Sequence, residues 1–239
     1  MTLSKPPLKE SGIPRHVAVI MDGNGRWARA RHRPRAYGHR IGVRAARRTV
    51  QAAHKQGVEV LTVFAFSQEN WQRPPAEVQL LIRLFKRVLA HEIRALHENR
   101  VRLRFIGDHR DFPQELREQM RDAERLTAAN TGLTLQIAVG YGGHWDIAQA
   151  ASRLCAAGEP ITPESLEKAL VTAGVPAPDL LIRTGGERRL SNFMMWQLAY
   201  TELYFTETLW PDFDEAQFAL ALDWYAGRER RFGRVPEAS

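Results

Sequence analysis

The chain has 239 residues, a length that suits one large α/β domain or two small ones. Its hydrophobic content of 44% and charged content of 26% are those of an ordinary globular protein. Its single cysteine, Cys155, excludes an intrachain disulfide framework and indicates a reducing compartment. Residues 1–15 lack the apolar run of a signal peptide, and no segment reaches the roughly 18 apolar residues of a membrane-spanning helix. We therefore expect a soluble, cytoplasmic protein.

The formal net charge of +7 predicts an anionic partner. Nine arginines and no acidic residue lie between Arg26 and Arg48. Such a run is typical of a solvated basic helix face. Arginine also binds phosphate oxygens through its planar, bidentate guanidinium group, which favours a phosphate ligand. Charge alone does not distinguish nucleic acid, a lipid headgroup and a small phosphate.

Short apolar runs alternate with helical patterns along the chain, which predicts a single α/β domain with a mostly parallel, six-stranded central sheet and helices on both faces. The pattern of residues 77–99 is more apolar than packing on a sheet requires. We expect a flexible N-terminus over residues 1–15, the domain over 16–233 and a tail over 234–239. The predicted strands cover residues 16–21, 58–66, 101–106, 133–139, 180–182 and 204–209, and the predicted helices 42–55, 77–99, 115–129, 145–156 and 163–173.

Polar or glycine-rich sequence follows four of these strands. In parallel sheets, ligands bind beyond the carboxyl ends of the strands. The segments 22–26, 67–73, 140–143 and 183–191 each occupy such a position. The sequence therefore predicts that they meet at one phosphate-handling site.

Three interpretations apply to the first of these segments, in which Asp22 precedes a glycine-containing loop. The loop formally matches the G-x-G-x-x-G/A dinucleotide fingerprint, but no acidic residue follows until Glu59, far beyond the ribose-binding position. A phosphatase built on a strand-end aspartate would have a second aspartate where this chain has Asn24. Asp22 can also face a phosphate across a divalent cation, with Arg26 and the loop amides holding the anion.

The segment after residue 182 is the second candidate anion site. Arg183, Arg189 and Ser191 surround a Gly-Gly turn, where backbone amides can approach an anion. The alternative is a basic turn in which an arginine pairs with Glu187.

Two tryptophans and one acid near the strand ends have two interpretations each. Trp27 beside Arg26, and Trp71 near Arg73, either pack in the core or line a site for an apolar, anionic ligand. Glu202, in an aromatic stretch, is either a buried structural acid with an arginine partner or a second metal ligand. For Cys155, a small core residue is the better interpretation than a nucleophile.

Several motifs, taken together, resemble the signatures of the cis-prenyltransferases, the family of bacterial undecaprenyl diphosphate synthase (isoprenyl transferase). The resemblance runs in order from Arg15 to Gly233 with its spacing intact. The matching segments are 16–28, 38–39, 64–74, 179–187, 191–193, 196–205, 210–213 and 230–233.

The resemblance implies a Mg²⁺-dependent transferase that condenses isopentenyl diphosphate sequentially onto farnesyl diphosphate. The product would be a long-chain polyprenyl diphosphate such as undecaprenyl diphosphate, the lipid carrier precursor for cell-wall synthesis. A hydrophobic tunnel near Leu84, Val88 and Leu133 would hold the growing tail. The resemblance also implies a homodimer in which residues 231–233 reach the neighbouring site, and peripheral contact with the inner face of the membrane through the lipid product. No nucleic-acid partner is expected.

Residue roles follow from matching positions. Asp22 would bind Mg²⁺ and act in catalysis, and Glu202 would be the other metal ligand. Asn70 matches the family's proton acceptor; a neutral carboxamide is a very weak base, so an orienting role, with the released diphosphate taking the proton, is the alternative. The implied substrate-binding residues are Gly23, Asn24, Gly25, Arg26, Trp27, Arg35 and His39 for the allylic diphosphate, Ser67, Gln68, Glu69, Trp71 and Arg73 in a closing segment, and Arg183, Arg189, Leu190 and Ser191 for isopentenyl diphosphate.

The chain departs from the family pattern at Gly140, at His144 and at Arg188, where relatives have asparagine, arginine and histidine. No role of those residues can be transferred. Two other classes of function are open: a non-catalytic subunit of the same fold, and a nucleic-acid binder using residues 26–48. The first is disfavoured because the site residues are present, and the second because only Trp27 and Tyr37 could stack on bases there.

Overall fold

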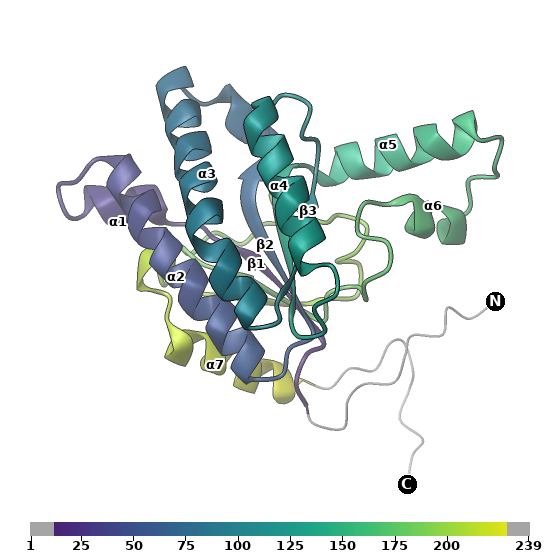
Figure 1. Ribbon diagram of the computed structural model, residues 1–239. Coiled ribbons are helices and arrows are strands. Elements are labelled where there is room, and N and C mark those ends of the chain that lie inside the picture. Colours follow the sequence, from purple (N-terminus) through teal and green to yellow (C-terminus); the bar gives the residue numbers. More distant parts are fainter. Residues whose placement is uncertain (1–11, 229–239) are drawn as a thin grey trace, which may run out of the picture.

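A central sheet of six parallel strands organises the chain in the computed structural model, which describes residues 12–228 (Figure 1). Each neighbouring pair is parallel, so the carboxyl ends of the strands lie at one edge. The predicted single α/β domain with a six-stranded sheet is confirmed. In spatial order the strands are β3 (Arg102–Ile106), β4 (Thr134–Tyr141), β2 (Val60–Ser67), β1 (His16–Ile20), β5 (Leu180–Arg183) and β6 (Glu202–Phe205).

Helices cover one face of this sheet. In Figure 1, α2, α3 and α4 lie alongside one another over that face, with α7 next to α2. The helices are α1 (Asn24–Arg29), α2 (Arg35–Lys55), α3 (Pro75–Glu98), α4 (Gln114–Thr127), α5 (Gly143–Ala156), α6 (Pro163–Ala169) and α7 (Glu215–Ala226), with short 3₁₀ helices η1 (Gln68–Gln72) and η2 (Trp210–Asp212).

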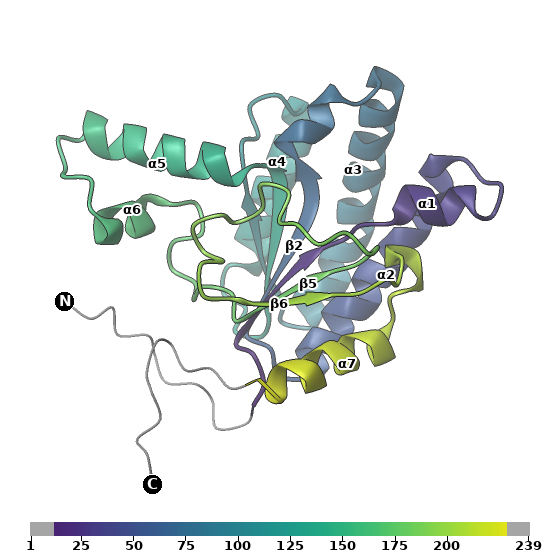
Figure 2. The same cartoon turned by 180° about the vertical axis from the view of Figure 1, so that it is seen from behind.

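The second face is covered differently. There α5 and α6 pack on each other and project to one side, as Figure 2 shows. The segment after β5 lies against the sheet instead, with Phe193 and Met194 fully buried among residues of β1 and β4. Helices therefore cover one face as predicted, whereas the second face is covered mainly by this irregular chain, and α5 and α6 project beside it.

The sixth strand was predicted at the wrong residues. It was expected over 204–209, but it runs over Glu202–Phe205. After Phe205 the chain leaves the sheet, and Trp210 is buried in η2, where its Nε1 donates to the carbonyl of Gly42 at 2.9 Å. The chain beyond the predicted strand thus contributes Trp210 to the core beneath α2.

His16 is a buried polar residue at the start of β1. Its Nδ1 lies 2.7 Å from the carbonyl oxygen of Pro176, which can only accept, so we infer that Nδ1 carries the proton. Its Nε2 then accepts from the Thr62 hydroxyl at 2.7 Å. Burial lowers the pKa of His16 to about 4, so the ring is neutral at pH 7.

This histidine predicts a pH dependence of stability. Between pH 6.5 and 4 the unfolded chain protonates His16 and the folded chain does not, because its pKa is lowered to about 4. The free energy of unfolding should therefore fall across that window, by up to about 3 kcal/mol from this residue. Urea unfolding at several pH values measures it. A His16→Gln variant should lose correspondingly less stability on acidification, and identical slopes would contradict the prediction.

The free edge of β3 is covered by α4. The Thr127 hydroxyl oxygen accepts from the amide of Leu103 at 3.0 Å, and Glu124 Oε1 accepts from the amide of Phe105 at 2.7 Å. Backbone donors that an edge strand usually offers to another chain are therefore bound within the domain.

Candidate active site

A cavity of about 1160 Å³ lies between α2, α3 and the sheet. It is larger than the ~300–1,000 Å³ of common small-molecule pockets. Its polar mouth is at the carboxyl edge of the strands, and its middle is apolar. Leu84 and Val88 line it as predicted, whereas Leu133 is packed in the core. The apolar lining includes Val43, Ala46, Val50, Leu81, Ile82, Phe85, Leu89, Leu96, Leu135, Ile137 and Val139.

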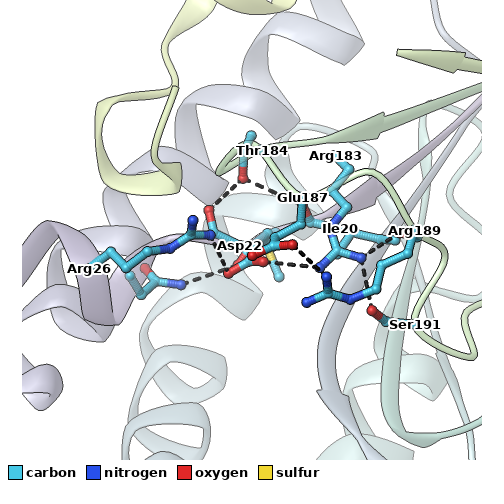
Figure 3. Close-up of polar contacts among 10 residues, drawn as sticks. Ile20, Asp22, Arg26, Arg183, Thr184, Glu187, Arg189 and Ser191 are labelled. Carbon is cyan, nitrogen blue, oxygen red and sulfur yellow. Dashed lines mark hydrogen bonds and ion pairs between the residues drawn. The ribbon is translucent and has the colours of Figure 1, made fainter. Parts of the chain in front are cut away.

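Asp22 lies at this mouth, two residues beyond the end of β1. Its carboxylate is held between two guanidinium groups, which approach from opposite sides in Figure 3: Arg183 Nη2 at 3.0 Å from Oδ2 and Arg26 Nη2 at 3.3 Å from Oδ1. The Thr184 hydroxyl donates to the Asp22 carbonyl at 2.7 Å and fixes the backbone. The structure thus brings the first and fifth strand ends together, as the sequence predicted.

Arg183 is the buried member of this group, with 4% of its side chain exposed. Besides Asp22 it donates through Nη1 to the Ser191 hydroxyl at 2.8 Å and to the carbonyl of Arg189. Arg189 itself forms an ion pair with Glu187, so the alternative of a basic turn is also realised. Arg183 therefore connects Asp22 to the loop that carries Ser191.

Two unsatisfied polar atoms face the loop after Asp22. Asn24 Oδ1 and His39 Nε2 are buried and have no hydrogen-bond partner within residues 12–228. Both residues line the cavity. Burial, together with the positive charges of Arg73 and Arg35, lowers the pKa of His39 to about 4, so its ring is neutral at pH 7. Buried atoms without partners mark a place where a polar ligand would satisfy them.

Close packing of α2 against this loop depends on glycine. A Cβ at Gly38 would lie 2.0 Å from the carbonyl oxygen of Asn24, and one at Gly42 would lie 2.2 Å from Asn24 Oδ1. Gly23, which precedes α1, has a φ of 112°, a conformation that side chains other than glycine rarely adopt. These glycines fix the position of the loop relative to Asp22.

We expect Gly38→Ala to lower the free energy of unfolding by about 2–3 kcal/mol and to impair the loop's ligand binding, because backbone must move to accommodate the methyl group. The control is Gly227→Ala, whose Cβ would lie 3.6 Å from its nearest neighbour. Denaturant unfolding of both variants measures the difference. Equal stability would show that the contact at Gly38 is relieved without cost.

Part of the predicted closing segment lines the same cavity as Asp22. Within it, Asn70 Oδ1 accepts from the amide of Ser67 at 3.2 Å, and Arg73 pairs with Glu77 at 3.1 Å. Trp71 does not line the cavity and packs on Phe66 and Phe112, with ring centroids 5.0 and 4.8 Å away. Of the segment's predicted site residues, the cavity is lined by Ser67, Glu69, Asn70 and Arg73 but not by Gln68 or Trp71.

Three other predicted site residues, Trp27, Arg35 and Leu190, do not line the cavity. Trp27 Nε1 donates to Asp212 at 2.6 Å. Arg35 pairs with Glu77 at 3.4 Å, and its Nε would lie 3.2 Å from a Cβ at Gly25. Leu190 packs against the core of the second sheet face.

The structure does not bring Glu202 to Asp22, and the expectation that one metal binds both is wrong for a single chain. Glu202 begins β6 and pairs with Leu180 at the start of β5, whereas Asp22 follows the carboxyl end of β1. Glu202 is thus at the opposite edge, where it pairs with Arg228 at 3.2 Å. Its interpretation as a structural acid with an arginine partner fits this geometry, although the residue is only partly buried.

The basic run from Arg26 to Arg48 divides into two groups. Arg26 reaches Asp22, whereas Arg48 donates to the carbonyl of Pro211 at 3.0 Å and Arg31 lies 4.0 Å over the ring of Trp27. Arg47 pairs with Glu92 across α2 and α3. Most arginines of the run are exposed, as in a solvated basic helix face, and within residues 12–228 only Arg26 of the run forms an ion pair with Asp22.

A Mg²⁺ ion fits the donor set at the mouth. Within residues 12–228 there is no cluster of three histidine, cysteine or carboxylate side chains that could hold a metal. Mg²⁺ commonly takes one or two carboxylates and completes its shell with water and substrate phosphate oxygens. Asp22, one-third exposed at the mouth, is suited to that mode.

Two residues that the sequence did not single out belong to this region. Thr184 holds the backbone of Asp22, and Asn192 lines the cavity and donates to Glu69 at 2.8 Å. Asn192 adjoins Ser191 within a matching motif, which was the available signal. Gly140, a departure from the family pattern, has a φ of 65°, and a Cβ there would lie 2.3 Å from the Asp108 carbonyl.

The comparisons with known proteins define the class. The family model described as "Putative undecaprenyl diphosphate synthase", a prenyltransferase family, matches residues 20–233, and the chain belongs to this family of prenyl-transferring enzymes. It is 53% identical over 231 residues to an isoprenyl transferase of Neisseria gonorrhoeae, covering 96% of this chain and 93% of that protein. It is 54% identical over 235 residues to a farnesyl-diphosphate-specific ditrans,polycis-undecaprenyl-diphosphate synthase of Xanthomonas axonopodis pv. citri, covering 95% and 91%.

Solved structures agree with this membership. Lavandulyl diphosphate synthase from Lavandula x intermedia, in complex with dimethylallyl diphosphate, superposes with a TM-score of 0.90 at 37% identity, covering 94% of this chain and all of that one. A probable undecaprenyl diphosphate synthase from Campylobacter jejuni gives 0.80 at 32%, covering 92% and 99%. The last matching motif, residues 230–233, lies outside the described residues. Within residues 12–228 we find no helix with the length and apolar character needed to cross a bilayer.

Proposed function

We propose that this enzyme elongates farnesyl diphosphate with successive isopentenyl diphosphate units, in the presence of Mg²⁺, to give undecaprenyl diphosphate, the lipid carrier precursor for cell-wall synthesis. The supporting observation is that a charged mouth adjoins an apolar cavity. A carboxylate held between Arg26 and Arg183 opens directly into an apolar cavity of about 1160 Å³. That arrangement suits a ligand with an anionic head and a long apolar tail.

Two diphosphates fit on the two sides of Asp22. We assign the allylic diphosphate to the loop after Asp22, where Arg26 supplies charge and Asn24 and His39 have unsatisfied polar atoms. We assign isopentenyl diphosphate to Arg189 and Ser191, next to Arg183. The cations compensate the charge of both anions.

Asp22 would hold the Mg²⁺ ion, whose positive charge favours departure of the allylic diphosphate. In the condensation, the allylic carbon–oxygen bond breaks and diphosphate leaves with the electron pair. The double bond of isopentenyl diphosphate forms the new carbon–carbon bond, and a proton is then lost from that unit. Asn70 Oδ1 already accepts from the amide of Ser67. This favours an orienting role for Asn70, with the released diphosphate taking the proton.

The remaining proposals concern assembly and membrane contact. We propose a homodimer that uses the β6 side of the sheet, where Tyr200 and Leu203 are 73% and 38% exposed. Peripheral contact with the inner face of the membrane would arise through the lipid product, in a cytoplasmic enzyme. Sedimentation at several protein concentrations tests the dimer.

The decisive assay incubates the protein with farnesyl diphosphate, labelled isopentenyl diphosphate and Mg²⁺, followed by chromatography of the lipid extract. We expect a long-chain polyprenyl product that disappears when Mg²⁺ is chelated. Absence of labelled lipid, together with tight oligonucleotide binding, would contradict the proposal. The same chromatogram gives the product length.

A further inference from the structure

Asn192 has an unusual backbone conformation at the junction of three segments. It follows Ser191, and the two residues have φ values of 60° and 50°. Positive φ is uncommon for residues other than glycine and is maintained only where surrounding contacts require it. The strained turn lies beside Arg183, because the Ser191 hydroxyl accepts from Arg183 Nη1 at 2.8 Å.

The backbone and side chain of Asn192 bind the start of α5. Its carbonyl accepts from the amide of Gly143 at 2.6 Å, and its Oδ1 accepts from the amide of His144 at 2.9 Å. A Cβ at Gly142 would lie 2.8 Å from Asn192 Nδ2. Gly142, in the segment after β4 that was predicted to meet the ligand site, therefore makes room for Asn192, whereas Gly143 makes room for Met195. Both acceptor atoms of Asn192 are fixed by these bonds.

The remaining donor of Asn192 faces the closing segment. Nδ2 donates to Glu69 Oε1 at 2.8 Å, and both residues line the cavity. Partial burial raises the pKa of Glu69, but the hydrogen bonds from Asn192, from the Glu69 amide and from Ser67, with the charge of His144, outweigh this effect and leave the pKa lowered. The Glu69 carboxylate is thus ionised and bound to a donor whose orientation α5 determines.

We propose that Asn192 is a positioning residue that holds the segment Ser67–Arg73 in its closed place over the cavity mouth by joining Glu69 to the first turn of α5. The adjacent Ser191 accepts from Arg183, so the same turn also fixes the position of the segment Ser67–Arg73 relative to Arg183. The expected effect on turnover rests on the proposed function, whereas the expected effect on the position of residues 67–73 does not. The geometry favours an Asn at this position, because its side chain accepts from the His144 amide through Oδ1 and donates to Glu69 through Nδ2 at once.

The test exchanges the donor and the acceptor in the hydrogen bond between Asn192 and Glu69. Asn192→Asp keeps an oxygen for the His144 amide but faces Glu69 with a second carboxylate. Glu69→Gln in the same chain supplies an NH₂ group that can donate to the carboxylate introduced at position 192 and restore the bond in the reverse direction. Hydrogen–deuterium exchange of peptides covering residues 67–73, without substrate, measures closure. Steady-state kinetics with farnesyl and isopentenyl diphosphates measure its consequence.

We expect Asn192→Asp to accelerate exchange at residues 67–73 and to raise the KM for isopentenyl diphosphate about 10-fold or more, with a smaller change in kcat. The double variant should recover most of both changes. Asn130→Asp is the matched control, since Asn130 Nδ2 donates to the carbonyl of Val101 at 2.7 Å, away from the cavity mouth. It should leave exchange at 67–73 unaltered.

Additive effects in the double variant, or unchanged exchange in Asn192→Asp, would overturn the inference. If Asn192→Asp does not fold, Glu69→Ala replaces it: the bonds to α5 remain, and exchange at 67–73 must still accelerate. Restored closure with no prenyl transfer by the unaltered protein would contradict the proposed function while upholding the role of Asn192.

Discussion

Replacing Asp22 by asparagine should lower kcat for chain elongation about 1,000-fold and leave the fold intact. Asparagine has the same shape but does not carry the charge that holds Mg²⁺, and metal-ion stabilisation of a developing charge contributes several kcal/mol. The neutral amide also leaves the guanidinium groups of Arg26 and Arg183, at 3.3 and 3.0 Å from the carboxylate, without compensation. Labelled isopentenyl diphosphate incorporation, measured across a range of Mg²⁺ concentrations, checks this expectation.

The matched control is Asp212→Asn. Asp212 also pairs with an arginine, Arg31 at 3.4 Å, and accepts from Trp27 at 2.6 Å, but it does not line the cavity. Its asparagine variant should turn over at nearly the normal rate. Circular dichroism should give native-state spectra like those of the unaltered protein for both variants, whereas Asp22→Asn should unfold more readily than Asp212→Asn because the buried Arg183 loses its compensating charge. Normal turnover by Asp22→Asn would remove Asp22 from the reaction.

Arg183→Lys should reduce kcat/KM for isopentenyl diphosphate about 30-fold or more. The guanidinium group contacts Asp22, Ser191 and the Arg189 carbonyl at once. An ammonium group is a compact point charge and cannot reproduce this planar, three-way contact. We expect the free energy of unfolding to fall by about 1–2 kcal/mol as well, since the Ser191 turn loses a buried hydrogen bond.

Arg188→Lys is the control for this change, since Arg188 is exposed on the same loop. It should leave kcat/KM within about 2-fold of the unaltered enzyme, as expected for a surface substitution. Arg183→Ala extends the series. Removal of one partner from a largely buried pair should destabilise the fold by about 3 kcal/mol. An active Arg183→Lys enzyme of normal stability would mean that charge alone is needed there.

Much of the fold could be predicted because the central strands are buried on both faces. All five residues of β1 are buried, and such strands appear in a sequence as continuous apolar runs. The edge strand β6 is only partly buried, so its limits were wrong by two residues at the start and four at the end. The start of α2 at Arg35 was missed because arginines occupy its exposed face. The predicted helix began at residue 42.

The site was predictable where it depended on strand ends. Asp22 follows β1 and Arg183 ends the neighbouring parallel strand β5, so their meeting follows from topology. Side chains that merely neighbour a motif were harder to assign. Trp27 donates to Asp212 and Trp71 packs on Phe112. The spacing of residues along the sequence does not predict these contacts. Glu202 is the first residue of β6, and in a parallel sheet the amino end of a strand lies at the edge opposite Asp22.

The amides of Leu103 and Phe105 on the edge strand β3 donate to side chains of α4. Another chain can therefore add to the sheet less readily at β3 than at β6. A neighbouring chain that tried to extend the sheet beyond β3 would have to displace two satisfied amide bonds before making any of its own. At the β6 margin the partly exposed Leu203 and the exposed Tyr200 present apolar surface instead. In the proposed homodimer, self-recognition would therefore use a single margin, which would limit growth to a closed pair and disfavour open-ended stacking of sheets.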